Sequence, residues 1–468
     1  LRVTLGEAAR YLGQRRLNFI RVEPRVRRND AALTLDVEFF ITRGPRVFVE
    51  RIDVEGNSTT LDRVVRREFR IAEGDPFNPR QIRAAAERIR ALNFFSNVEV
   101  NAREGSAPDQ VVIDVDVEEA PTGSLGFGAN YSIEDGLGFA VTFNERNFLG
   151  RGQFIGLTFN SSPDNQEYTF NFREPKLLGR DLAFGFLASY RETSGVNDAD
   201  FDTQTIVLSP SVAFPLSENG RLQLRYRVSQ EEISDVSADS SRILAAEEGQ
   251  ELRSEIGYTY SYDTRRTGLN PAAGVLLQFS QDIAGFGGDS QYVRTTARAL
   301  AERRVAREEV TLRAAVEGGA LNMLDDGASR ITDRFRISSR QFRGFSGGGI
   351  GPRDLNAANR DALGGNYYAV ARFEAEFPLG LPEEYGVRGG AFFDIGSLWD
   401  LDNAQGGPQG PFVAGNEIDD SFHLRSTVGV SLFFDSALGP LRFNFSHPLE
   451  KQSYDRTRSF DFTISTRF

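Results

Sequence analysis

Apolar and polar residues alternate with a period of two along most of the chain after residue 120. In the terminal stretch "SFDFTISTRF", apolar and aromatic side chains fall on one face and polar or charged side chains on the other. The segments 221–229 and 255–263 divide in the same way. Because successive side chains of a β-strand point to opposite faces, this pattern predicts strands whose two faces meet different environments.

The number and spacing of these strands predict the architecture. Sixteen strand candidates fit between residues 124 and 468, and many have the length of about 9–11 residues that crosses a bilayer when tilted. Their connections alternate between short turns such as "SIEDG" and long polar stretches at 191–202, 232–250 and 322–364. An even strand number with short turns on one side is typical of outer-membrane barrels. We therefore expect a mainly β fold, a 16-stranded antiparallel transmembrane barrel over 121–468, with a soluble all-β repeat fold as the alternative.

The first 120 residues mix helical and strand patterns instead. Residues 45–120 predict a complete α+β module of the order β-α-α-β-β. Its first helix has Thr60 as a plausible N-cap, and its second has Asn78 as cap and Pro79 at the first helical position. Residues 1–44 repeat the last part of this pattern, a helix and two strands. The chain is therefore expected to begin inside one repeat, with sequence missing upstream.

Composition narrows the class of protein. Hydrophobic residues make up 40%, and no apolar run approaches the ~18 residues that a spanning helix needs, which excludes a helical membrane protein. The 38 Phe and 46 Gly residues fit short strands with aromatic lipid contacts and tight turns. A net charge of −12 is a poor match for nucleic acid, and the absence of Cys removes disulfides and thiolate metal sites.

The most unusual segment is "SSRQFRGFSGGGIGPRD", residues 338–354, inside the longest predicted loop. Its "GGGIG" lacks the Lys-Ser/Thr of a phosphate-binding loop and no helix follows it, so we expect no nucleotide cofactor. The flanking of Arg343 by Phe342 and Phe345 favours a folded hairpin tip. A flexible surface loop is the alternative.

The strands after this loop offer carboxylates for Arg343. Alternation in "YYAVARFEAEFPLG" and "VRGGAFFDIG" puts Glu374 and Asp394 on the polar face, which in a barrel is the lumen. A guanidinium on an inward-folded loop can bind a carboxylate through two hydrogen bonds. Spacing alone leaves open whether these carboxylates are paired or merely solvated.

The loop "QFRGF", the strand "FFDIG", the stretch "GGNYYAVARFEAEFP" and the terminal Phe468 together resemble the BamA family of outer-membrane assembly factors. Residues 45–120 resemble the membrane-proximal POTRA domain of that family, and residues 1–44 the end of the preceding one. The family often has Val or Ile where this chain has Phe342.

That resemblance implies a location, partners and a site. The barrel would lie in the bacterial outer membrane and the POTRA part in the periplasm. Its partners would be unfolded outer-membrane protein clients, accessory lipoproteins bound through POTRA domains, and outer-membrane lipid, but no nucleic acid. In the inward-folded loop 338–362, Arg343, Gly344 and Phe345 would enter the lumen, and Arg343 would pair with Asp394 close to Glu374.

The first and last strands are expected to meet at a weak seam, which would open laterally without ATP. Gly126 and Gly128 weaken the packing of the opening strand. The closing strand carries Ile464 and stops at Phe468, the last residue of the chain. We expect few backbone hydrogen bonds there, or a kinked final strand. Incoming strands would then template on the exposed edge.

Two other functional classes were weighed against assembly. An enzyme is disfavoured because His423 and His447 are the only histidines and no catalytic triad or metal-ligand spacing is present, so no catalytic or metal residues are assigned. A secretion pore of the two-partner or TamA-like type shares the barrel, the loop and the POTRA modules. The sequence pattern alone does not separate that pore from an assembly factor.

Overall fold

The computed structural model describes residues 20–29, 34–43, 47–132, 136–195, 201–265, 273–404, 418–436 and 439–467. The chain forms two compact units: Leu1–Gly123 with Glu145–Gln153, and Ser124–Asn144 with Phe154–Phe468. Within the described residues, no helix is both long enough and apolar enough to cross a membrane.

The first unit contains a hairpin and an α+β module. Strands β1 (Ile20–Asn29) and β2 (Thr34–Arg43) pair antiparallel. The module runs β3 (Phe48–Glu55), α2 (Asp62–Arg66), α3 (Pro79–Ala91), β4 (Phe95–Glu104) and β5 (Gln110–Glu119). Strand β5 lies in the middle of the sheet, parallel to β3 and antiparallel to β4. The predicted β-α-α-β-β order is confirmed, whereas the helix expected before residue 20 lies outside the described residues.

The apolar faces of both helices pack on one face of this sheet. The core contains Val64 and Val65 of α2, Ile82, Ala85 and Ile89 of α3, and Ile113 and Val115 of β5. Helix α3 begins as predicted, because the Asn78 side chain accepts a hydrogen bond from the Arg80 amide at 3.1 Å.

The prediction that Thr60 caps α2 is wrong, because Leu61 occupies the cap position and makes no side-chain cap bond. Instead, the Glu119 carboxylate of β5 accepts the amides of Thr59 and Thr60, at 3.0 and 2.6 Å. The Thr60 hydroxyl accepts a hydrogen bond from Asn147 Nδ2, at 2.8 Å, within the same unit. Glu119 thus binds the two amides that precede the cap position, and fixes the turn that leads into α2.

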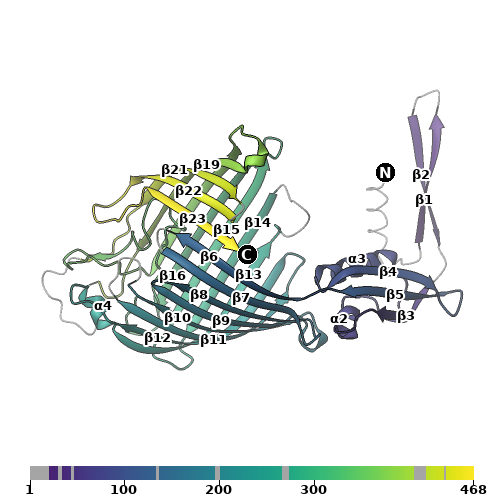
Figure 1. Cartoon of the computed structure of the whole chain (residues 1–468), viewed down its shortest axis with the longest axis horizontal. Coiled ribbons are helices and arrows are strands. Elements are labelled where there is room, and N and C mark those ends of the chain that lie inside the picture. The colour runs from purple at the N-terminus through teal and green to yellow at the C-terminus, as the bar shows by residue number, and fades with distance from the viewer. Residues whose placement is uncertain are drawn as a thin grey trace. The chain divides into compact units, whose positions relative to one another are not determined.

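The second unit is a closed antiparallel barrel of sixteen strands, which confirms the predicted fold class (Figure 1). Its strands are β6 (Gly123–Ser132), β7 (Gly136–Phe148), β8 (Gln153–Ser162), β9 (Asn165–Glu174), β10 (Ala183–Thr193), β11 (Asp202–Pro215), β12 (Gly220–Ser234), β13 (Gly249–Asp263), β14 (Ala273–Ala284), β15 (Tyr292–Val305), β16 (Val310–Met323), β18 (Tyr367–Pro378), β19 (Val387–Trp399), β21 (Arg425–Ser436), β22 (Gly439–Glu450) and β23 (Phe460–Arg467). Each strand pairs with its neighbour in this order, and β23 closes the barrel on β6.

The two ends of the barrel differ in their connections. Short helices η1 (Leu177–Gly179) and η2 (Glu383–Tyr385) lie in connections at one end, which we call the short-turn end. The opposite, long-loop end carries α4 (Arg242–Ala246) and a two-stranded ladder of β17 (Arg353–Asp354) with β20 (Ile418–Asp419). These long loops share a buried apolar cluster that includes Phe201, Ile243, Leu244, Ile331, Leu363 and Leu401. They form a packed cap rather than independent loops.

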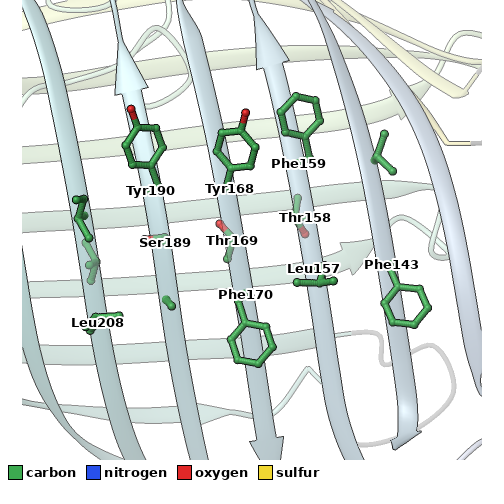
Figure 2. Close-up of a pocket in the computed structure, with 14 residues that line it drawn as sticks. Phe143, Leu157, Thr158, Phe159, Tyr168, Thr169, Phe170, Ser189, Tyr190 and Leu208 are labelled. Atoms are coloured by element: carbon green, nitrogen blue, oxygen red, sulfur yellow. The ribbon is translucent and has the colours of Figure 1, made fainter.

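Alternation along the strands separates an apolar outer face from a polar inner face. Figure 2 shows Phe159, Tyr168 and Tyr190 side by side on neighbouring strands of the outer face, with ring centroids 5.0 and 5.9 Å apart. Inside the barrel, Arg225 Nε donates to Asp282 Oδ1 at 2.8 Å. Such a surface suits a barrel that is solvated by lipid outside and by water and paired charges inside.

The first unit yields a prediction about Glu119. Burial alone would raise the pKa of this carboxyl, but the hydrogen bonds from Thr60, Ser58 and Thr59 lower it to about 2. Because the unfolded value is about 4.3, the stabilisation is present above that pH and is lost as the pH falls toward about 2. We expect Glu119→Gln to cost about 1 kcal/mol at pH 7, a value reduced by solvent screening.

Calorimetry of the full chain at pH 7, 5 and 3 measures this effect as a lower melting temperature of the first unit. The difference in melting temperature between Glu119→Gln and wild type should be smaller at pH 3. Glu118→Gln is the control, since the neighbouring Glu118 is exposed. Equal melting of Glu119→Gln and wild type at pH 7 would show that the carboxylate does not hold α2.

Candidate functional site

The long loop between β16 and β18 folds back into the barrel. Phe342 and Phe345 are each 1% exposed, and their ring centroids lie 5.1 Å apart. They share a buried cluster with Leu321 of β16, Val370 of β18 and Leu398 of β19. The segment 338–354 is therefore an ordered part of the barrel interior and not a flexible surface loop.

Arg343 sits at the tip of this loop and is bound to the barrel wall by a bidentate ion pair. Its Nε and Nη2 donate to the two carboxylate oxygens of Asp394 at 2.8 and 2.6 Å, and its amide donates to the same carboxylate at 3.1 Å. Both side chains are buried, with exposures of 8% and 0%. The guanidinium also lies 3.7 Å from the ring centroid of Phe392. Loop and strand β19 are thus joined by charge, hydrogen bonds and stacking.

Glu374 of β18 extends this pair into a larger lumen network. Its Oε2 accepts from Arg343 Nη1 at 2.5 Å and from Arg442 Nη2 at 2.6 Å. Its Oε1 accepts from Arg313 Nη1 at 3.3 Å. The network therefore links the loop to β16, β18, β19 and β22. The two carboxylates of this network, Glu374 and Asp394, each have at least one guanidinium partner, as a charge removed from water requires.

The structure thus brings together the loop arginine and both carboxylates named from the sequence. Three members of the network were not predicted from the sequence: Arg442, Arg313 and Phe392. Alternation in "PLRFNFS" puts Arg442 opposite Leu441 and Phe443, so the reasoning applied to Glu374 would have found it. Phe392 gives no such signal, because an aromatic residue on the lumen face looks like any other aromatic residue.

Gly344 is required by the close approach of the loop to the barrel wall. Its φ is +91°, and a Cβ at this position would lie 2.6 Å from Thr427 Cγ2 of β21. A larger residue would suffer both the left-handed conformation and this clash. Its carbonyl accepts a hydrogen bond from the Arg458 amide at 2.9 Å.

The seam between the first and last barrel strands is short. Among the described residues, β23 pairs with β6 over five residues, Thr463–Arg467 with Gly128–Ser132. It pairs with β22 over five as well, whereas β12 and β13 pair over fourteen. Figure 1 shows β23 next to β6. Of the residues assigned to the seam, Gly128 and Ile464 lie in the paired part, Gly126 lies outside it, and Phe468 lies outside the described residues.

The histidines take part in local contacts at the long-loop end and in the barrel wall. His423 Nε2 lies 3.0 Å from the Asp419 carboxylate, which also accepts the Tyr454 hydroxyl at 2.9 Å. Burial raises the pKa of Tyr454, and its bond to Asp419 raises it further. His447 lies within β22. In the part of the chain that the structure describes, no three His, Cys, Asp or Glu side chains are grouped as a metal site would need.

Comparison with known proteins places this geometry in a family. Residues 147–468 match the model of the Omp85 superfamily domain, and residues 47–120 match that of the POTRA repeat described as a surface antigen variable number repeat. The outer membrane protein assembly factor BamA of Neorickettsia risticii is 25% identical over 98% of this chain and 60% of its own length. BamA of Nitratidesulfovibrio vulgaris is 27% identical over 96% of this chain and 55% of its own length. The chain therefore spans somewhat more than half the length of these relatives.

Solved structures show the same fold. The crystal structure of BamA from Haemophilus ducreyi lacking POTRA domains 1–3 covers 99% of this chain and 94% of its own, with a TM-score of 0.79 and 22% identity. CdiB from Acinetobacter baumannii covers 99% and 82%, with a TM-score of 0.59 and 13% identity. The resemblance inferred from the loop and strand motifs is confirmed. Since the superfamily model matches more than half of its residues, the chain belongs to the Omp85 superfamily.

Proposed function

We propose that this barrel inserts client β-barrel proteins into the outer membrane by opening laterally between β6 and β23. The observation that carries the proposal is the short pairing of β23 among the described residues, five residues with each neighbour, compared with fourteen between β12 and β13. Its clients are unfolded outer-membrane proteins. Accessory lipoproteins bind through the POTRA domains, and lipid surrounds the barrel.

The energetic argument starts from the backbone. Every N–H and C=O group left unpaired in hydrocarbon costs several kcal/mol, so a barrel parts most readily where it has the fewest ladder bonds. Opening at β6 and β23 exposes two strand edges, which an incoming strand can pair with by β-augmentation. The client's own folding and burial in lipid supply the driving force, so the mechanism needs no nucleotide.

The lumen network supports this mechanism by holding the rest of the wall fixed. We assign to Arg343, Gly344 and Phe345 the role of fastening the loop, with Asp394 and Glu374 as their acceptors. The short-turn end faces the periplasm and the long-loop end faces the outside, following the general pattern of outer-membrane barrels. Strand β23 then descends from the extracellular side toward the periplasm.

The first prediction from this mechanism concerns a locked seam. Ser132 and Thr463 are directly opposite across β6 and β23, so Ser132→Cys with Thr463→Cys can form a disulfide. We expect the oxidised protein to stay folded but to lose insertion of client barrels into lipid vesicles, and reductant to restore it. The chain has no native cysteine to interfere.

The control is a disulfide between two strands that pair over more residues. Thr158→Cys with Thr169→Cys crosslinks β8 to β9, where nine residue pairs are formed, and should leave insertion intact. Normal insertion by the locked seam would show that the barrel does not work by lateral opening.

Depletion in the source bacterium tests the secretion alternative, which predicts loss of one secreted protein instead of many outer-membrane proteins.

The second prediction concerns the ion pair of the loop. We expect Arg343→Ala to lower barrel stability, because it leaves the buried Asp394 without its cation. Such a loss costs about 3–5 kcal/mol when fully desolvated, and less beside a wet lumen. Arg343→Lys should recover part of it, since lysine supplies charge but not the bidentate geometry.

The temperature at which the heat-modifiable form unfolds in semi-native electrophoresis measures this effect. Arg191→Ala is the matched control, because Arg191 pairs with Glu167 at 2.8 Å but is 56% exposed, and exposed pairs contribute little. Equal losses from Arg343→Ala and Arg191→Ala would remove the case for a fastened loop.

A further inference from the structure

The segment 451–459, which we call the lead segment, connects β22 to the closing strand β23 and leaves the barrel wall to join the lumen loop. Ser346 N donates to Arg456 O at 3.0 Å, Arg456 N donates to Gly349 O at 2.9 Å, and Arg458 N donates to Gly344 O at 2.9 Å. Phe345 and Thr457 form a β-bridge between these bonds. The loop thus pairs with the lead segment along its backbone, as a partner strand would.

Side chains fix the lead segment at a second set of points. Asp455 binds Arg425, the first residue of β21, through two bonds of 3.0 Å, and the two side chains are 0% and 1% exposed. Arg456 Nη2 donates to the Asn359 carbonyl at 2.8 Å. The start of β23 is therefore held by the loop and, through the lead segment, by the nearby strand β21, in addition to its ladder with β22 and independently of β6.

Gly349 makes the backbone pairing possible. A Cβ at this residue would lie 2.5 Å from the Arg456 carbonyl oxygen and 2.8 Å from that of Ser346. These are backbone atoms and cannot turn aside as a flexible side chain can. A glycine is needed here because the two backbones approach each other closely. Its backbone conformation does not require glycine, since Gly349 is not among the residues with positive φ.

We infer that the loop 338–354 is a latch for the closing strand: it keeps the extracellular start of β23 fixed while the remainder of β23 parts from β6. This inference rests on the proposed lateral opening and adds where the strand is held. The connection is short, because Arg343, which binds Asp394, precedes Gly344, which accepts the Arg458 amide two residues before β23 begins. The same loop that is fastened to the lumen network therefore determines how firmly β23 is anchored.

Hydrogen–deuterium exchange of the full chain in lipid nanodiscs tests the latch without reference to any client. We expect Gly349→Ala to speed exchange of the amides in residues 456–463 at least tenfold, while β18 and β19 stay as in wild type. Gly327→Ala is the control: it lies in the same loop, and its Cβ would meet only the flexible Asp325 carboxylate. Unchanged exchange in residues 456–463, or equal acceleration by both variants, overturns the latch.

A crosslink between the bridged residues gives a second test, which also decides the matter if Gly349→Ala does not fold. In the variant Phe345→Cys with Thr457→Cys, the oxidised and reduced forms share any cost of losing the phenyl ring. If the latch stays closed during opening, oxidation leaves insertion of client barrels unchanged, whereas the seam disulfide abolishes it. If oxidation of this latch pair abolishes insertion, the start of β23 must leave the loop during opening, and the inference is overturned.

The two tests separate this inference from the proposed function. If the wild-type chain inserts no clients at all, lateral insertion fails as a function. The exchange measurement still shows whether the loop holds the start of β23.

Discussion

This structure depends on one constraint: in the hydrocarbon of a lipid bilayer, backbone N–H and C=O groups must form their hydrogen bonds within the protein. Hydrocarbon offers no partner to an N–H or C=O group, so every strand of the wall needs a neighbour and the sheet must close. Sixteen strands satisfy this condition, and β23 completes the circle on β6. Closure makes the length of each ladder matter, because a wall with a short ladder is the easier to part. Among the described residues, β23 pairs over five residues with each neighbour, compared with fourteen between β12 and β13.

The polar interior follows from the same alternation that makes the exterior apolar. Side chains facing the lumen cannot be covered by lipid, and charges placed there need partners or water. Arg343 is suited to this position, because its planar guanidinium binds Asp394 with two hydrogen bonds and Glu374 with a third. A buried pair of this kind adds little net stability compared with an apolar core. Its effect is to specify one position of the loop, in which both carboxylates bind the guanidinium.

The part of the architecture that follows local rules was predictable from the sequence. Alternation marked all sixteen barrel strands, and it placed Glu374 and Asp394 on the lumen face where Arg343 reaches them. Features that depend on long-range backbone geometry were not predictable. Thr60 had the right residue type for a cap, but Leu61 occupies the cap position, and Glu119 from a strand far along the chain binds the Thr60 amide. The backbone pairing of the loop with the lead segment is visible in the sequence only as Gly344 and Gly349. Such glycines are equally expected in a flexible loop.

A weak seam by itself does not make a useful gate, because a strand free at both ends would leave the barrel altogether. The lead segment resolves this difficulty by giving β23 unequal ends. Its start continues into residues bonded to the loop and, through Asp455 and Arg425, to β21. Among the described residues, the last part of the strand, Ser465–Arg467, pairs with β6, whereas the ladder to β22 covers Phe460–Ile464. In the lateral opening that we propose, separation begins at the end that pairs with β6 alone and stops at the latch, so an edge is exposed while the strand remains in place to close again. In this proposal, a lumen loop fastened by Arg343 allows a short ladder to act as a gate in a wall that must otherwise stay closed.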